Sequence, residues 1–264
     1  MSNEVTAEIL TTHILDLARE GRRIDGRRTD DYRPVEIVPG FAASADGSAL
    51  ARIGQTAALC GVKLEPGKPY PDTPNAGTLT TNAELIPLSS ASFEPGPPHP
   101  RAIEVSRVVD RAIRAAETID LKKLCVTPSE KCWTCFVDVH ILDHAGNLID
   151  AASLAALGAL THTTVPNVRF GIGERDLPLD VQHFPVEVTF CRLGETIVVD
   201  PLVEEERAAQ GRLTIATDEL GNVVAMQKGL IGAFSPDDVK ALAERAVVHG
   251  DRLRAAARAP GGAR

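Results

Sequence analysis

The sequence predicts an α+β fold built as two successive halves, each a group of strands followed by a helix. In both halves, short runs rich in Val, Ile, Thr and Phe are separated by Gly and Pro, a pattern typical of strands. Segments with helical apolar periodicity follow them. VEIVPGF and LDHAGN of the first half return weakly as VEVTF and TDELGN in the second, which hints at a duplicated unit.

The composition indicates a folded protein with a substantial core. Its 264 residues are 44% hydrophobic, enough for one large domain or two modest ones. No apolar run approaches the roughly 18 residues of a membrane span, so we expect a cytoplasmic protein with no membrane contact. The net charge of −8 argues against binding nucleic acid over the whole surface, although a local basic strip stays possible. The five cysteines are expected to be reduced thiols, with no disulfide.

The first elements are a helix and several strands. Apolar side chains recur near helical spacing over 3–20, and Gly21 follows as a stop. A charged turn segment, RRIDGRRTDDYRP, comes next. The predicted antiparallel strands lie in VEIVPGF, SALARIGQTAALCGVKLE and LTTNAELIPL. FEPGPPHPR is predicted as a loop, because its prolines exclude a helix or a central strand.

The remaining elements complete both halves. A helix is predicted over 102–119, and CVTPSEKCWTCFVDVHILDHAGNLID reads as strand, turn and strand before a helix from about Ala151 to Thr161. A boundary is expected around VPNVRFGIGERDLPLDVQ. Four strand-like runs then precede a final helix with Ser235 as its N-cap. The predicted division is a helix and charged turn over 1–28, a first domain over 29–170, a second over 171–258 and a loose tail over 259–264.

Two aspartates flank the turn in LDHAGNLIDAASLA, and paired carboxylates can serve acid/base chemistry. They can equally close a hairpin and cap a helix, which is the interpretation we favour. We expect Gly146 or Asn147 to take a positive φ and Asp143 to bond backbone amides in the turn. Asp150 is expected to cap the helix that begins at Ala151.

The C-x-x-C motif at 132–135 has the spacing of a redox pair or half a zinc site. Here it lies within an alternating strand pattern, where residues three apart face opposite sides. We therefore predict that Cys132 and Cys135 are buried thiols and that the chain holds no metal. A thiol or zinc protein centred on this motif stays an alternative. His140 and His144, about 13 Å apart on a strand, cannot share one ion.

The helix over 102–119 combines a basic stripe with an apolar face. At 100° per residue, Arg107, Arg111 and Arg114 fall in one narrow sector. The opposite sector is apolar and contains Val105, Val108, Val109, Ala112 and Ala116. The stripe is either a solvated face with ion pairs such as Asp110 to Arg114, or a contact for successive phosphates of a single strand.

Five stretches, in order along the chain, carry a family resemblance. They are IDGRR at 24–28, GSALARIGQTAALCGVKLE at 47–65, NAELIPLSSASFEPGPP at 82–98, AIEVSRVVDRAIR at 102–114 and VDVHILDHAGNLIDAASLAALGAL at 137–160. This set resembles the RNase PH family, most closely the non-catalytic RNase PH-type subunits of archaeal exosomes. The resemblance covers roughly residues 10 to 258.

The resemblance implies an RNase PH fold with a first half like ribosomal S5 domain 2, followed by a smaller α+β C-terminal half. It implies a hexameric ring of three catalytic and three non-catalytic subunits, with S1/KH-type RNA-binding caps. Such a ring degrades single-stranded RNA 3′→5′, using inorganic phosphate at the catalytic partner's site and no other cofactor. By this resemblance Arg107, Arg111 and Arg114 would face the RNA.

Two departures from the catalytic relatives favour a silent chain. Those relatives carry an A-D-G-G-type acidic loop, and a basic pair before the long helix. The corresponding segments of this sequence are DHAGN and HPR. We therefore expect a structural, RNA-binding subunit without catalytic residues of its own. The alternative is an active RNase PH-type phosphorolytic exoribonuclease built on Asp143 and Arg101. Arg101 also leaves a residual anion-binding role open.

Overall fold

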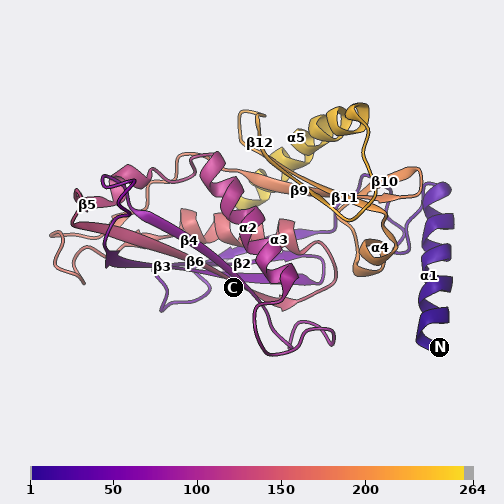
Figure 1. Ribbon diagram of the computed structural model, residues 1–264, viewed down its shortest axis with the longest axis horizontal. Helices are drawn as coiled ribbons and strands as arrows, with labels where there is room; N and C mark the ends of the chain where they lie inside the picture. Colours follow the sequence, from indigo (N-terminus) through magenta and orange to yellow (C-terminus); the bar gives the residue numbers. More distant parts are fainter. Residues whose placement is uncertain (1, 259–264) are drawn as a thin grey trace.

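Two β-sheets enclose one central helix, α3, in the computed structural model, which describes residues 2–258 (Figure 1). The predicted loose tail at 259–264 lies outside the described residues. The chain has the predicted α+β architecture of two halves, each with its own sheet. Among the described residues, no helix is both long and apolar enough to cross a membrane.

The first sheet has six strands in the order β1-β2-β3-β6-β4, with β5 pairing β6. Their bounds are β1 Val35–Pro39, β2 Gly47–Ile53, β3 Thr56–Gly67, β4 Thr78–Leu85, β5 Cys125–Thr127 and β6 Lys131–Asp143. The prediction that all strands run antiparallel is wrong for β4, which pairs parallel to β6. The chain between these two strands crosses over through helix α2 (Pro100–Ala115), as a parallel pairing requires.

The second sheet contains the four predicted strands of the second half, all antiparallel, in the order β10-β9-β11-β12. Their bounds are β9 Val186–Leu193, β10 Thr196–Val199, β11 Gly211–Thr217 and β12 Val223–Gly229. A short helix, α4 (Val203–Ala208), interrupts a stretch that was predicted to hold only strands. The Glu205 carboxylate accepts the Leu202 amide at 2.8 Å and so favours this helical turn. Between the halves, β7 (Thr164–Val165) pairs with β8 (Leu177–Pro178).

Helix α3 (Leu148–Thr161) begins three residues before the predicted start, and every residue from Leu148 to Leu160 is buried. Its apolar residues lie on all sides, as expected for a helix with protein on every face, and Asp150 and Ser153 are its buried polar residues. Small residues allow the first sheet to approach closely. A Cβ added at Gly158 would lie 2.9 Å from the Ala49 Cβ and 3.0 Å from the Ile37 Cγ2. This tight contact fixes the helix against β1 and β2.

Three amphipathic helices complete the fold (Figure 1). Helix α1 (Ser2–Arg19) packs Ile14 and Ala18 against the second sheet and α4. Helix α2 ends earlier than predicted, because Glu117 adopts a positive φ of 51° just after the C-cap. Helix α5 (Pro236–Arg258) covers β9 and β11. Ser235 caps it as predicted, with its Oγ accepting the Asp238 amide at 3.1 Å.

Glu187 on β9 is an unpaired buried carboxyl group. It is fully buried, and neither of its side-chain oxygens has a hydrogen-bond partner in the described part of the chain. Burial, and secondly the nearby charge of Asp150, raises the pKa of Glu187 well above its ordinary value. An unsatisfied buried polar group destabilises a fold by about 1–3 kcal/mol.

We therefore expect Glu187→Leu to raise the free energy of unfolding by about 1–3 kcal/mol, because it removes an unsatisfied polar group and keeps an apolar side chain of similar size. Glu187→Gln is the matched control, which keeps the polar group and should change stability little. Urea denaturation measures both at neutral pH. A lower midpoint for the leucine variant would contradict this account of Glu187.

Candidate nucleic-acid interface

The predicted basic stripe lies on the outer face of α2. Arg107, Arg111 and Arg114 are exposed, and the five apolar residues predicted opposite them are all buried. The arginines border a groove of about 660 Å³ between α2 and the edge strand β4. The other residues that line it are Leu79, Thr80, Thr81, Ser106, Asp110 and Ala115. Since none of these is aromatic, the groove suits a sugar-phosphate backbone better than stacked bases.

The three arginines differ in how strongly they are engaged. Arg107 has no hydrogen-bond or ion-pair partner within residues 2–258. Arg111 donates one hydrogen bond through Nη2 to the Gln227 Oε1 at 2.8 Å. Arg114 donates through Nε to the Asp110 Oδ2 at 2.7 Å and through Nη2 to the Leu79 carbonyl at 2.5 Å. Arg107 is therefore the most available cation, and Arg114 the least.

Arg101, at the start of α2, belongs to a separate cluster. Its Nη1 lies 3.1 Å from the His144 Nε2, and its Nη2 forms an ion pair with Glu206. The other Glu206 oxygen accepts the Asn147 amide at 2.8 Å, beside the first turn of α3. The carboxylate of Glu206 thus occupies two donors that an incoming anion would use. This internal pairing opposes the residual anion-binding role considered for Arg101.

Asp143 ends strand β6, and its side chain is exposed. The predicted bond from its carboxylate to the turn amides is wrong, because no such contact exists among the described residues. The His144 Nδ1 instead accepts the Gly146 amide at 3.3 Å. Burial, followed by the charge of Arg101, lowers the pKa of His144 to about 4. The imidazole is therefore neutral at pH 7 and stacks on Phe93, with ring centroids 5.4 Å apart.

The turn that follows β6 leads into α3 and is not a hairpin. Gly146 and Asn147 both take a positive φ, 98° and 57°, as predicted for one or the other. Asp150 does not cap the helix, because α3 begins at Leu148 and Asp150 is its third residue. The Asp150 carboxylate is fully buried and accepts hydrogen bonds from three side chains. The donors are the Tyr32 hydroxyl at 2.6 Å, the Thr189 hydroxyl at 2.7 Å and the Asn147 amide group at 2.8 Å.

A second buried carboxylate, Asp200, was not found by sequence reasoning. Arg33 pairs with it at 2.6 Å, Arg27 at 2.8 Å, and the Asn147 side chain donates to it at 2.8 Å. Burial alone would raise the pKa of Asp200, but the hydrogen bonds and charge of Arg33 lower it. The charged turn in RRIDGRRTDDYRP was the only visible sign, because Arg33 and Asp200 are 167 residues apart. The cluster joins the N-terminal segment to both halves and is structural.

The cysteines of the C-x-x-C motif are buried on strand β6. Burial raises the pKa of the Cys135 thiol to about 12 and also raises that of Cys132. Both groups are therefore protonated thiols at neutral pH, unlike metal-binding or nucleophilic thiolates. His140 lies 3.3 Å from Glu84, whereas His144 contacts Arg101. Within the described residues, no group of three or more His, Cys, Asp or Glu side chains could hold a metal.

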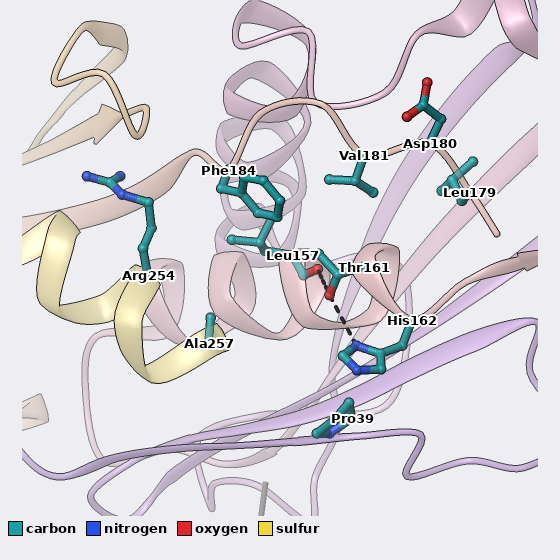
Figure 2. A pocket seen from close by; sticks show the side chains of 10 residues that line it. All are labelled: Pro39, Leu157, Thr161, His162, Leu179, Asp180, Val181, Phe184, Arg254 and Ala257. Atoms are coloured by element: carbon teal, nitrogen blue, oxygen red, sulfur yellow. Dashed lines mark hydrogen bonds between the residues drawn. The ribbon is translucent and has the colours of Figure 1, made fainter. Parts of the chain in front are cut away.

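A further cavity of about 510 Å³ lies at the C-terminal end of α3 (Figure 2). Leu157 of α3 and Phe184, just before β9, lie next to each other in its lining, and the Thr161 Oγ1 lies 3.1 Å from the His162 Nδ1. Arg254 donates to the Thr217 carbonyl at 2.7 Å and pairs with Asp251. The Thr161 hydroxyl donates to the Gly158 carbonyl at 2.9 Å, and the His162 Nδ1 lies 3.0 Å from the same carbonyl. Because the backbone of α3 engages both groups, they form no free nucleophile and base, and the cavity is not a candidate active site.

Comparisons with known proteins agree with the fold and the resemblance. Models of the 3′ exoribonuclease family match residues 31–166 with domain 1 and residues 183–248 with domain 2. Exosome complex component Rrp42 of Thermococcus kodakarensis is 48% identical over 258 residues, which is 95% of this chain and 95% of that protein. The protein of the same description from Methanopyrus kandleri is 48% identical over 240 residues, covering 89% of this chain and 90% of that one.

Solved structures of exosome chains also match this chain over nearly its full length. A chain in the Archaeoglobus fulgidus exosome with RNA bound to the active site superimposes with a TM-score of 0.92 and 45% identity, covering 95% of this chain and 98% of that one. A chain of an archaeal exosome core gives 0.90 and 41%, covering 98% and 100%. Since the family models match most of the chain and the relatives align over nearly its full length, the chain belongs to the RNase PH family of 3′ exoribonucleases.

Proposed function

We propose that this chain is a non-catalytic, RNA-binding ring subunit of an exosome that degrades RNA from its 3′ end by phosphorolysis. The observation that carries the proposal is the groove between α2 and β4, where Arg107 and Arg111 face solvent in one line. The similarity to Rrp42 proteins and to exosome chains, one of them in an RNA-bound exosome, supports membership of a multi-subunit exosome.

The proposed lack of catalytic activity follows from how the charged side chains of this chain pair with one another. Phosphorolysis needs hydrogen-bond donors and cations directed at an incoming phosphate. In the cluster around Arg101, the Glu206 carboxylate already takes the guanidinium and the Asn147 amide, and it would repel a phosphate. Asp143 stands exposed and makes no side-chain hydrogen bond within residues 2–258. In the alternative of an autonomous enzyme built on Asp143 and Arg101, the Arg101 guanidinium is therefore already engaged.

The proposed assembly places this chain with a catalytic RNase PH-like subunit, three copies of each, beneath S1/KH-type cap subunits. Inorganic phosphate is used at the partner's site, and no other cofactor is required of this chain. The proposed location is the cytoplasm. In such a ring the stripe would hold the single-stranded substrate on its path to the partner's active site, by contacts to phosphates that read no sequence.

The decisive experiment compares this chain alone with the chain and its catalytic partner together. We expect no shortening of a 3′ single-stranded RNA by the chain alone in phosphate, and processive shortening once the partner is added. A gel assay with end-labelled RNA measures both, with the partner alone as the control. Phosphate-dependent degradation by the purified chain, free of contaminating nuclease, would overturn the proposal.

Substituting the arginines of the stripe should weaken RNA binding in a graded way. In the assembled ring, Arg107→Ala and Arg111→Ala should each lower the slope of log affinity against log salt by about 0.7, the value for one phosphate contact to a single strand. Arg114→Ala is the matched control and should change the slope less, because Asp110 and the Leu79 carbonyl already engage Arg114. If Arg107→Ala and Arg111→Ala bind like wild type across the salt series, the stripe is only a solvated face.

A further inference from the structure

One carboxylate stands among the cations of the groove. Asp110 lies on α2 between Arg107 and Arg114, and it lines the same groove. Its side chain is 26% exposed, so part of the carboxylate meets solvent. A negative charge at this point repels phosphate oxygens. An RNA strand held by the arginines must therefore present a different group to Asp110.

The Asp110 carboxylate is held in place and still has room for a donor. Its Oδ1 accepts from the Thr81 hydroxyl at 3.0 Å, and its Oδ2 accepts from the Arg114 Nε at 2.7 Å. These contacts come from β4 and from the next turn of α2, so they fix the side chain from two directions. An ionised carboxylate has about four lone-pair sites, and here only two are used. Each oxygen can accept one more hydrogen bond from a group in the groove.

We propose that Asp110 accepts a hydrogen bond from a ribose 2′-hydroxyl and thereby makes this groove select RNA over DNA. The inference rests on the proposed RNA-binding function. Arg107 and Arg111 are one helical turn apart, about 6 Å along the axis, which suits neighbouring phosphates. Asp110 lies between them along the helix, where the sugar that joins those phosphates would pass. The 2′-hydroxyl is the group by which proteins tell RNA from DNA.

The neighbouring hydroxyl groups are weaker candidates for this contact. Thr80 is exposed in the groove but offers a neutral oxygen, and the Ser106 hydroxyl already donates to the Ile103 carbonyl at 3.0 Å. A hydrogen bond to an ionised acceptor is roughly twice as strong as one between neutral groups. Deoxyribose would leave the Asp110 carboxylate facing phosphates with no compensating donor. Discrimination between the two sugars therefore concentrates at Asp110.

The test measures the affinities of the assembled ring for an RNA and a DNA of the same unstructured sequence, in buffer without phosphate so that the RNA stays intact. We expect Asp110→Ala to reduce the RNA/DNA affinity ratio about tenfold, the value of one hydrogen bond to a charged group. DNA should bind more tightly to this variant, because a repelling charge is gone. Asp110→Asn keeps an acceptor oxygen and should retain part of the ratio.

Arg107→Ala separates this inference from the proposed function. It should weaken RNA and DNA equally and leave their ratio unchanged, because both carry phosphates. If Arg107→Ala weakens both nucleic acids but Asp110→Ala leaves the ratio unaltered, the sugar contact is wrong and the RNA surface stands. If neither arginine nor aspartate substitution alters binding, the surface itself is wrong. A ratio that changes with base identity in place of sugar identity would assign Asp110 to a base and overturn the inference.

Discussion

Replacing Asp200 with alanine is expected to lower the free energy of unfolding by about 3–5 kcal/mol, the cost of leaving a buried charge without its partner. Asp200 is fully buried, and Arg33 donates to it through its backbone amide, Nε and Nη2. Alanine at this position would leave the Arg33 guanidinium, which is itself buried, without its carboxylate partner. Asp200 also has a φ of 47°, a conformation that aspartate tolerates better than alanine.

Urea denaturation of the Asp200→Ala variant measures this loss, with Asp16→Ala as the matched control. Asp16 pairs with Arg19 at an exposed site, where an ion pair contributes about 0–1 kcal/mol. The double variant Arg33→Ala with Asp200→Ala should be less damaged than the sum of the singles, because it removes both charges. Strictly additive losses would show that the two residues do not stabilise the fold as a pair.

Asp150 should be far more sensitive to alanine than to asparagine. Asp150→Ala leaves the Tyr32 and Thr189 hydroxyls and the Asn147 amide group without their acceptor, at about 1–3 kcal/mol for each buried group. Asparagine can accept from Tyr32 and Asn147 with its oxygen and donate to Thr189, whose hydroxyl lies 2.8 Å from the Thr214 hydroxyl. We expect Asp150→Ala to lose several kcal/mol and Asp150→Asn to lose about 1 kcal/mol or less.

The pH dependence of stability provides a second test of Asp150. Burial raises the pKa of Asp150 from 3.8 to about 6, so between these values the folded chain binds more protons than the unfolded chain. The contribution of Asp150 to stability therefore falls as the pH rises from 3.8 to about 6. Asp150→Asn lacks this titration, so its stability relative to wild type should increase over that range. A constant difference between the two proteins would contradict the raised pKa.

Asp143 supplies the control for both measurements. Its side chain is exposed, so Asp143→Ala should change stability by less than about 0.5 kcal/mol. A second variant, Asp143→Asn, discriminates the autonomous-enzyme alternative. Should Asp143→Asn leave the ring intact yet abolish phosphorolysis, the turn would be an acid site and the proposed silent role would be wrong.

The exposed face of α2 could be predicted from the sequence because it depends on local periodicity. Arg107, Arg111 and Arg114 share a sector at 100° per residue whatever the helix contacts, and their opposite face is apolar. Periodicity could not show which of these arginines form hydrogen bonds with other residues of the chain. Gln227, which accepts from Arg111, lies on β12, 116 residues further along the chain.

The start of α3 was mispredicted because its cap is unusual. Asn147 precedes the helix with a left-handed φ, and its side chain donates to Asp150 and Asp200 without capping a helix amide. Local rules expect a side-chain oxygen to accept such an amide, so they assign that task to the nearest carboxylate, Asp150. The backbone amide of Asn147 instead donates to Glu206, a residue on α4. Only the tertiary fold brings it there.

The burial of α3 on every side has a consequence for how the chain opens. Its amide hydrogens can meet water only when both sheets separate from it, so they should exchange with solvent only on global unfolding. A fragment ending at residue 166 would contain α3 but not β9, which covers one side of this helix. The Asp150 carboxylate would then lack the two hydrogen bonds that Thr189 donates. The apolar surface uncovered on that flank favours association between such fragments. We therefore expect the two ranges matched by the family models to unfold as one cooperative unit.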